Sequence, residues 1–312
     1  MLRILLCILA VGLASSAPQF SHDADAVAVY FYLEVPESDQ IPLNSFKESI
    51  TNVIRKYNSS RGDQVLVTVT CGGGQYIYYG SVYSQLLRLN HQGIPWIAFI
   101  DQVGASGGYL AILGADQIYG NEHAMVGSIG VVIESDNIYE ALNRQGIVHE
   151  IFTAGSHKRD YSSMMNNSAD NLARLQDRLD YLHQQFIQTV ELHRGDVMLE
   201  IARQRAESYC QTLFQIIPWV ETMELFQSAN STDALCHGSD LDLLVNEIYL
   251  QHLRSVTQGD TWIGEDAIKV GLIDGIMTYE GYLDSLDSTK YQLDKQQDNQ
   301  SMSMLEDLLR SV

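Results

Sequence analysis

Short apolar runs that do not alternate with polar residues constrain the fold of this 312-residue chain more than any other feature. Strands are predicted at residues 27–35, 64–70, 96–100 and 147–153, with shorter apolar runs at 117–119 and 129–133. Strands that are apolar throughout and alternate with helices are typical of a parallel sheet covered on both faces. Active sites of such folds lie at the carboxyl ends of the strands.

Apolar residues at helical spacing, together with residues typical of helix ends, predict helices between these runs. Ser45 and Glu48 predict a capping box at the start of the first helix. Gly93 and Gly146 mark the ends of two later helices. Helices are predicted near residues 45–57, 82–93, 106–113, 137–145 and 168–194. The leucine stripe of the last one faces the core or, alternatively, a partner helix.

The second half of the chain departs from this alternation. Residues 197–257 mix helical and polar stretches, which predicts a helical insertion or small subdomain. Residues 264–274 return to the main pattern, with a short helix, Gly271 as its stop and a strand that starts at Leu272. Beyond residue 288 the chain is rich in Gln and Asp, and we expect it to be loose. The predicted organisation is an N-terminal segment over 1–16, one domain over 17–290 that includes the insertion, and a polar tail over 291–312.

The charge balance excludes one class of partner. The chain has 19 Lys and Arg residues against 39 Asp and Glu residues, which gives a formal charge of −20. Because phosphate backbones are bound by clustered cations, nucleic acid is not expected as a partner. The sequence has no His, Cys and Asp cluster with ligand spacing and no Walker or Rossmann glycine pattern in context. We therefore expect neither a metal nor a nucleotide cofactor.

The first residues read as a targeting segment. Arg3 precedes a continuous apolar run over 4–13, and small residues follow at 14–17. This pattern predicts a signal peptide that is removed after Ser16 or Ala17, so the protein is expected in the periplasm, outside the cell or in a secretory lumen. An uncleaved membrane anchor is the competing interpretation. In an oxidising compartment Cys210 and Cys236 can pair across the insertion, or both can remain thiols.

Ser106 is the strongest candidate for a chemical role. It stands in Gly104-Ala105-Ser106-Gly107-Gly108, at a predicted strand-to-helix turn. Flanking glycines leave a serine hydroxyl exposed, and the amides at a helix start can bind an anion. A nucleophile of acyl transfer needs both features. The alternative is a small-residue turn that only permits close packing.

A serine nucleophile needs a general base, and the sequence offers several candidates. They are Lys158, which follows the predicted strand at 147–153, and three histidines, His123, His237 and His252. A lysine can serve only when its amine is shielded from water. Each candidate can equally be an ordinary solvated side chain.

Blocks of sequence around these residues resemble the signal peptide peptidase A (SppA/SohB) family. The order and spacing of the blocks match the family over about residues 25–285, apart from the insertion. The blocks are ASGGY at 105–109, GSIGV at 127–131, AGSHK at 154–158, and WIGEDA at 262–267 with GLID at 271–274.

The resemblance implies an α/β fold of the Clp protease/crotonase type, a layered domain built on repeated ββα units. Ser106 then matches the nucleophile of a Ser/Lys dyad, Lys158 its general base, and Ser128 the serine that holds the lysine amine. The oxyanion hole is implied at the N–H of Gly107 and at the glycine pair Gly73 and Gly74.

The family also implies partners and a setting. Its members degrade signal-peptide remnants and other hydrophobic or unfolded peptides in or near membranes, and they assemble as homo-oligomeric rings. In half-length members the serine and the lysine can come from neighbouring subunits. This chain departs from the family in its glycine loop, where Thr70-Cys71-Gly72-Gly73-Gly74 replaces the usual Asn-Ser-Pro-Gly-Gly, and in the length of the 197–257 insertion.

Two other functions fit parts of the sequence. The pattern Gly104-x-Ser106-x-Gly108 also satisfies the nucleophile elbow of α/β-hydrolase esterases, with His252 as the late histidine. The altered glycine loop and the insertion also fit a catalytically impaired relative that binds peptides or scaffolds a membrane complex.

Overall fold

A mixed α/β sheet forms the body of the molecule. The computed structural model describes residues 28–220, 238–286 and 291–295. In these residues the strands follow the order β6-β5-β3-β2-β1-β8, and β4 pairs with β3 and with β7. All of these pairs are parallel except β5 with β6. The strands are β1 (Ala28–Glu34), β2 (Gln64–Cys71), β3 (Trp96–Ala105), β4 (Gln117–Gly120), β5 (Met125–Gly127), β6 (Thr261–Ile263), β7 (Gly275–Ile276) and β8 (Tyr291–Lys295).

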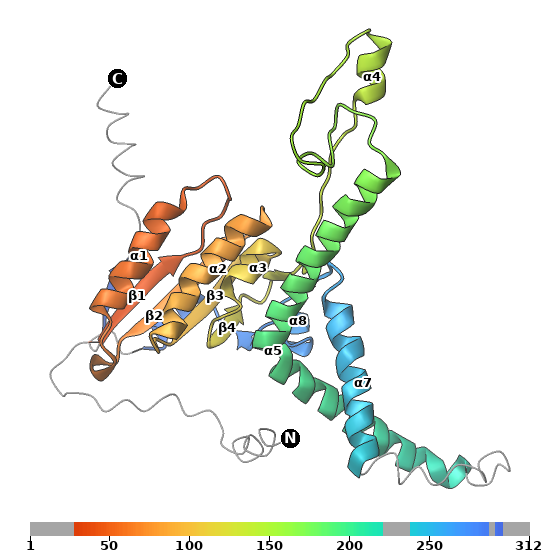
Figure 1. Ribbon diagram of the computed structural model, residues 1–312. Helices are drawn as coiled ribbons and strands as arrows, with labels where there is room; N and C mark the ends of the chain where they lie inside the picture. The colour runs from red at the N-terminus through yellow and green to blue at the C-terminus, as the bar shows by residue number, and fades with distance from the viewer. Residues whose placement is uncertain (1–27, 221–237, 287–290, 296–312) are drawn as a thin grey trace.

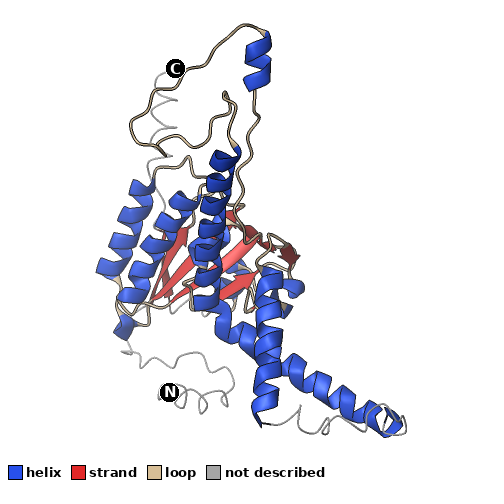
Figure 2. Cartoon of the chain, turned by 45° about the vertical axis from the view of Figure 1, so that its right-hand side comes forward, coloured by secondary structure: helices blue, strands red, loops and turns tan. Residues whose placement is uncertain are grey.

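Helices cover both faces of the sheet, which confirms the layered α/β prediction. The helices α1 (Leu43–Lys56), α2 (Tyr76–His91) and the first half of α5 (Ala169–Val220) lie in front of the strands in Figure 2. Phe31 and Val67 are buried in the core cluster that includes residues of these helices. Tyr30 and Leu66, one position away on the same strands, pack with α9 (Tyr279–Asp284) on the other face. Since both faces are buried, the central strands are apolar at nearly every position.

The first helix starts earlier than the capping-box prediction requires. The N-cap of α1 is Pro42, and no side chain caps the helix there. Ser45 therefore lies inside the first turn, and the predicted role of Ser45 and Glu48 is wrong. Pro42 has no N–H that would need an acceptor, and its backbone is extended, so it is compatible with the position just before the helix.

Residues 128–168 form an arm that rises away from the sheet and contains one helix, α4 (Tyr139–Arg144) (Figure 1). The apolar run at 129–133 and the strand predicted at 147–153 both fall in this arm, and neither forms a strand. Val132, Val148 and Phe152 are 84%, 79% and 89% exposed. The strand prediction failed because an apolar run becomes a strand only beside a pairing partner, and the described part of this chain offers none here.

The insertion predicted at 197–257 is helical. The second half of α5 projects from the body, and α7 (Gly238–Val256) runs back along it (Figure 1). Ala202, Ala206 and Val245 form a small core between the two helices. Cys210 on α5 is disulfide-bonded, and Cys236, the partner considered above, lies outside the described residues.

The end of the described chain returns to the sheet. Residues 264–274 contain α8 (Glu265–Lys269), but Leu272 and Ile273 are buried without forming a strand, which starts only at Gly275. Residues 291–295, assigned above to a loose polar tail, pair with β1 as β8. The tail prediction is wrong at these residues because Tyr291 and Leu293 alternate with polar residues and pack on the α9 face.

The predicted targeting segment at 1–16 lies outside the described residues. Among the residues that the structure describes, no helix combines the length and the apolar character needed to cross a membrane.

Candidate active site

The site is built where β2 and β3 end side by side. These strands are parallel, and Cys71 at the end of β2 lies opposite Gly104 near the end of β3. Ser106 follows β3 directly and precedes the short helix α3 (Gly107–Ile112). The glycine loop at 72–74 follows β2. The two glycine-rich segments singled out in the sequence therefore meet at one edge of the sheet.

Ser106 has a strained backbone. Its φ is 49° and its ψ is −122°, a conformation that residues with a Cβ rarely adopt. Neighbouring hydrogen bonds hold it there. The Ser106 N–H donates to the carbonyl of Gly127 at 2.8 Å, and the Ser106 carbonyl accepts the N–H of Leu110 at 2.9 Å. A half-buried serine fixed in this way at a strand-to-helix turn has the geometry expected of a nucleophile.

The glycines that follow Ser106 leave no room for a side chain. A Cβ on Gly107 would lie 2.4 Å from the ring of Tyr79, and one on Gly108 would lie 2.3 Å from the carbonyl oxygen of Cys71. The start of helix α3 therefore lies directly against the backbone of β2 and the side chain of Tyr79 on α2. This close approach points the first amides of α3 toward the turn, and the Gly107 N–H has no acceptor within the described residues.

The glycine loop packs directly against the serine. Gly73 has a φ of +101°, and a Cβ there would lie 2.7 Å from the Gly107 nitrogen and 3.0 Å from the Ser106 hydroxyl oxygen. Gly74 has a φ of +156°, and a Cβ there would lie 2.8 Å from Asp39. Ser106, Gly107 and the glycine pair therefore lie in one cluster.

Ser128 occupies the equivalent place on the neighbouring strand. Ala105 and Gly127 are paired across β3 and β5, so Ser106 and Ser128 each follow a paired residue at the same edge of the sheet. The φ of Ser128 is 51°, close to that of Ser106, and its N–H donates to the carbonyl of Asp260 at 2.7 Å.

Lys158 is separate from this cluster within one chain. It lies in an exposed turn of the arm, where its N–H donates to the carbonyl of Gly155 at 3.2 Å. The arm leads away from the sheet edge (Figure 1). Two residues later, Asp160 is buried and binds Arg174 and Arg178 of α5. The structure brings together Ser106, Gly107, Gly73, Gly74 and Ser128, and it does not bring Lys158 to them in a single copy.

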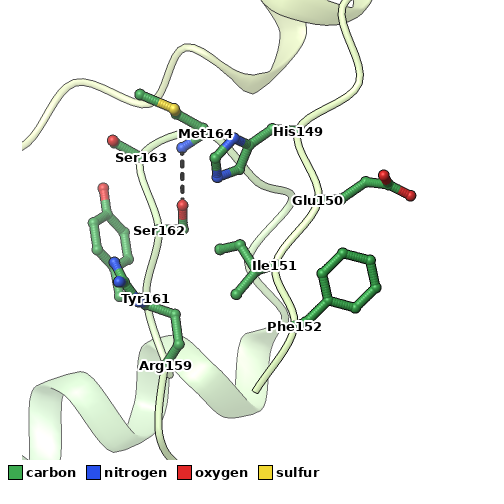
Figure 3. Close-up of a pocket in the computed structure, with 9 residues that line it drawn as sticks. All are labelled: His149, Glu150, Ile151, Phe152, Arg159, Tyr161, Ser162, Ser163 and Met164. Carbon is green, nitrogen blue, oxygen red and sulfur yellow. Dashed lines mark hydrogen bonds between the residues drawn. The ribbon is translucent and has the colours of Figure 1, made fainter.

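The arm also contains a hollow of about 580 Å³, which lies beside the Lys158 turn and not at Ser106. Figure 3 shows its walls, two stretches of the arm on either side of that turn. Ile151 and Met164 provide apolar surface, while His149, Glu150 and Arg159 provide charged or polar groups.

Neither of the two candidate histidines that the structure describes, His123 and His252, offers a base to Ser106. His123 is exposed and lies 3.4 Å from Glu122, and His237 is outside the described residues. His252 is buried between α5 and the end of α8. Since Arg205 can only donate, His252 Nδ1 accepts its hydrogen bond at 3.0 Å, and Nε2 donates to the carbonyl of Val270 at 3.0 Å. Both ring nitrogens are occupied, so the esterase interpretation lacks its histidine.

The last block of the resemblance, at 271–274, supports the fold and not the chemistry. Arg194 of α5 donates to the Gly271 carbonyl at 2.7 Å and to the Asp274 carboxylate at 2.9 Å. Asp274 also accepts the N–H of Ile118, and the Tyr109 hydroxyl donates to the Leu272 carbonyl at 2.7 Å. Burial raises the pKa of Tyr109, which keeps it a neutral donor. These bonds tie α3 and β4 to the long helix.

Comparison with known proteins finds a family match that covers this part of the chain. The model of peptidase family S49 matches residues 88–210, which include Ser106, Ser128 and Lys158. This part of the chain is similar to peptidase family S49.

Curated proteins that resemble this chain are named as probable proteases. The chain is 33% identical over 150 residues to a probable protease SohB from Haemophilus influenzae, which covers 48% of this chain and 42% of that protein. A probable protease SohB from Buchnera aphidicola subsp. Schizaphis graminum is 28% identical over 247 residues, which covers 79% of this chain and 56% of that protein. The chain thus spans about half the length of these curated relatives.

Among solved structures, a mutant ClpP1 from Listeria monocytogenes aligns with a TM-score of 0.39 and 8% identity. That alignment covers 82% of this chain and 95% of the other.

The structure also adds residues that the sequence did not reveal. Asp39 accepts the N–H of Gln75 at 2.8 Å, Tyr79 packs against Gly107, and the Cys71 sulfur accepts the N–H of Gly73 at 3.3 Å. Asp39 and Tyr79 come from segments with no motif, so sequence spacing gives no signal for them. Cys71 was visible only as a departure from the family's glycine loop.

Proposed function

We propose that this chain is a serine endopeptidase that uses Ser106 as its nucleophile. The observation that carries the proposal is the cluster at the edge of the sheet, where a strained serine lies against the glycine loop and against the amide of Gly107. A nucleophile and anion-binding amides in contact are what acyl transfer requires.

The proposed reaction has two stages. Ser106 attacks the peptide carbonyl while Lys158 accepts its proton, and the proton then passes to the leaving amine. Water hydrolyses the acyl-enzyme, again with Lys158 as the base. The Gly107 N–H and one amide of the glycine pair bind the oxyanion, and Ser128 holds the lysine amine in place.

The dyad in this proposal is completed between two copies of the chain. In one copy Lys158 is exposed on the arm, and a lysine has to be shielded from water to act as a base. The arm also exposes Val132, Val148 and Phe152, which a monomer has no reason to leave in water. Packing of the arm against a neighbouring copy buries these side chains and delivers the lysine amine to the neighbour's Ser106. A homo-oligomeric ring accommodates such a head-to-tail contact.

The proposed substrates are hydrophobic or unfolded peptides, including signal-peptide remnants, and the proposed setting is an exported protein near a membrane. The relatives named as probable proteases SohB support the peptidase activity. The resemblance to the signal peptide peptidase A family supports the substrate class and the setting.

Mixing two inactive variants tests this function and its division between subunits. We expect Ser106→Ala and Lys158→Ala each to lower the hydrolysis of a fluorogenic hydrophobic peptide by at least about a thousandfold. In an equal mixture of the two, exchanged by mild dissociation, about one site in four combines an intact serine with a neighbour's intact lysine. Activity should therefore return to roughly a quarter of the wild-type value.

A Lys47→Ala variant is the control, because Lys47 is an exposed lysine on α1. We expect wild-type activity from it. A mixture that stays inactive although its subunits exchange would place both groups of the dyad in one chain. Full activity of Lys158→Ala alone would remove the lysine from the mechanism.

A further inference from the structure

The glycine loop of this chain should be poorly ordered on its own. Three consecutive glycines, Gly72 to Gly74, follow β2, and no proline restricts them. Glycine loses more backbone freedom on ordering than any other residue. The loop is nevertheless held against Ser106, with Gly73 at a φ of +101°. A specific set of contacts has to hold it there.

Cys71 provides the central contact. It ends β2, is 1% exposed, and its sulfur accepts the N–H of Gly73 at 3.3 Å. The thiol donates in turn to the hydroxyl of Tyr79 at 3.0 Å, and that hydroxyl donates to the carbonyl of Pro36 at 3.2 Å. Burial raises the pKa of the Cys71 thiol, so it keeps the proton that it donates. The chain of bonds links the loop to α2 and to the segment after β1.

Asp39 fixes the other end of the loop. Its carboxylate accepts the N–H of Gln75, the residue that follows Gly74, at 2.8 Å. The segment that carries Asp39 is itself held by the Tyr78 hydroxyl, which donates to the Ile41 carbonyl at 2.7 Å. The amides on both sides of Gly74 are thus engaged.

The amide of Gly74, unlike that of Gly73, is available to bind a substrate oxygen. Within the described residues it donates to no protein group, whereas the Gly73 amide is bonded to Cys71. The resemblance did not distinguish between the two glycines as oxyanion donors. The hydrogen bonds make this distinction, because an amide bonded to a buried sulfur is not available to a substrate.

We propose that Cys71 is a positioning residue of the oxyanion hole: its sulfur holds the Gly73 amide, so that the Gly74 N–H, together with that of Gly107, binds the oxyanion. This inference rests on the proposed peptidase function. Cys71 itself touches no substrate and takes no part in the chemistry.

Three variants test this role. Cys71→Ala removes every hydrogen bond of the sulfur, including the one to Gly73, and Cys71→Ser keeps a donor and an acceptor at the same place. Val69→Ala is the matched control, because Val69 is fully buried two residues earlier on the same strand and in the same core cluster. It makes a cavity without touching the glycine loop.

The readouts separate loop positioning from general destabilisation. For Cys71→Ala we expect kcat to fall by roughly tenfold to a hundredfold with KM nearly unchanged, since loss of one oxyanion donor costs about 10² to 10³ in rate. A peptide aldehyde, which forms an oxyanion on the serine, should bind less tightly by a similar factor. The matching peptide alcohol, which forms none, should bind as before. Cys71→Ser should retain most of the activity, and Val69→Ala should retain kcat although its Tm falls.

The inference is overturned if active Cys71→Ala protein has the wild-type kcat, if aldehyde and alcohol lose affinity equally, or if Val69→Ala loses as much kcat. Hydrogen exchange adds a measurement that needs no activity. The Gly73 amide should exchange faster in Cys71→Ala than in the wild type, and unchanged protection contradicts the proposed bond. A wild-type protein that hydrolyses no peptide and leaves Ser106 unlabelled by a fluorophosphonate refutes the peptidase function instead.

Discussion

At Ser106 the local sequence was sufficient to predict the strand-to-helix turn. A serine between small residues after an apolar strand produces the exposed turn, and the glycines that follow it are required by contacts of 2.4 and 2.3 Å from their missing Cβ atoms. The residues that support this turn were not predictable. Asp39, Cys71 and Tyr79 meet only through the fold, and each is an ordinary residue in its own segment.

Protonation of His252 is expected to make the stability of the protein depend on pH. Burial, the largest cause, lowers the pKa of His252, the hydrogen bond to Val270 opposes this, and Arg205 lowers the pKa further. In the unfolded chain the histidine titrates at the ordinary value of about 6.5. The unfolded state therefore binds more protons below that pH, and stability rises with pH through this window.

We expect the free energy of unfolding of the wild type to fall as the pH drops below about 6.5 toward the lowered folded value. His252→Gln, whose amide can bond to both Arg205 and Val270, should show a shallower fall. Urea unfolding at pH 7.5 and 5.5 measures both proteins, and the other histidine with a lowered pKa, His193, is present in each. Identical slopes for the two proteins would show that His252 is not the titrating group.

The secondary structure elements were predictable where both of their faces are buried. The strands β1, β2 and β3 were found because continuous apolar runs have one structural solution in a parallel sheet. β8 was missed because, among the described strands, it pairs with β1 alone at an edge of the sheet and alternates polar with apolar residues. The run at 147–153 was overpredicted because the same apolar pattern in the arm has no partner strand in the described chain.

Asp160 joins the arm to helix α5. The Asp160 carboxylate is 2% exposed and binds Arg174 and Arg178, which lie one turn apart on α5. It therefore anchors the turn that carries Lys158. We expect Asp160→Asn to lower kcat by about tenfold, because small displacements of a catalytic group are costly. The core lies elsewhere, so Tm should change little.

Asp170→Asn is the matched control for this prediction. Asp170 binds the same Arg174, but its side chain is 78% exposed and it stands on α5 itself. Exposed ion pairs contribute little, so we expect activity within about twofold of the wild type. Peptide hydrolysis and thermal unfolding of both variants provide the comparison. Equal losses in the two would mean that Asp160 has no special role in holding the arm.

How copies of the whole molecule assemble cannot be predicted from local sequence patterns. The proposed nucleophile, the proposed base and the expected ring all come from sequence blocks and from the family they resemble. The distance between the two groups in the proposed assembly is not encoded in any local pattern. In one copy the arm separates them, with the cluster at the sheet edge and the lysine on an exposed turn. The proposed assembly joins an exposed apolar arm to an incomplete site.

The distance between the Ser106 hydroxyl oxygen and the Lys158 amine nitrogen in an experimental structure of the assembled protein tests this account most directly. We expect about 2.6–3.2 Å between the serine of one subunit and the lysine of its neighbour, with the arm buried at the contact. An assembly in which every Lys158 amine lies in bulk water, beyond reach of each Ser106, would contradict it.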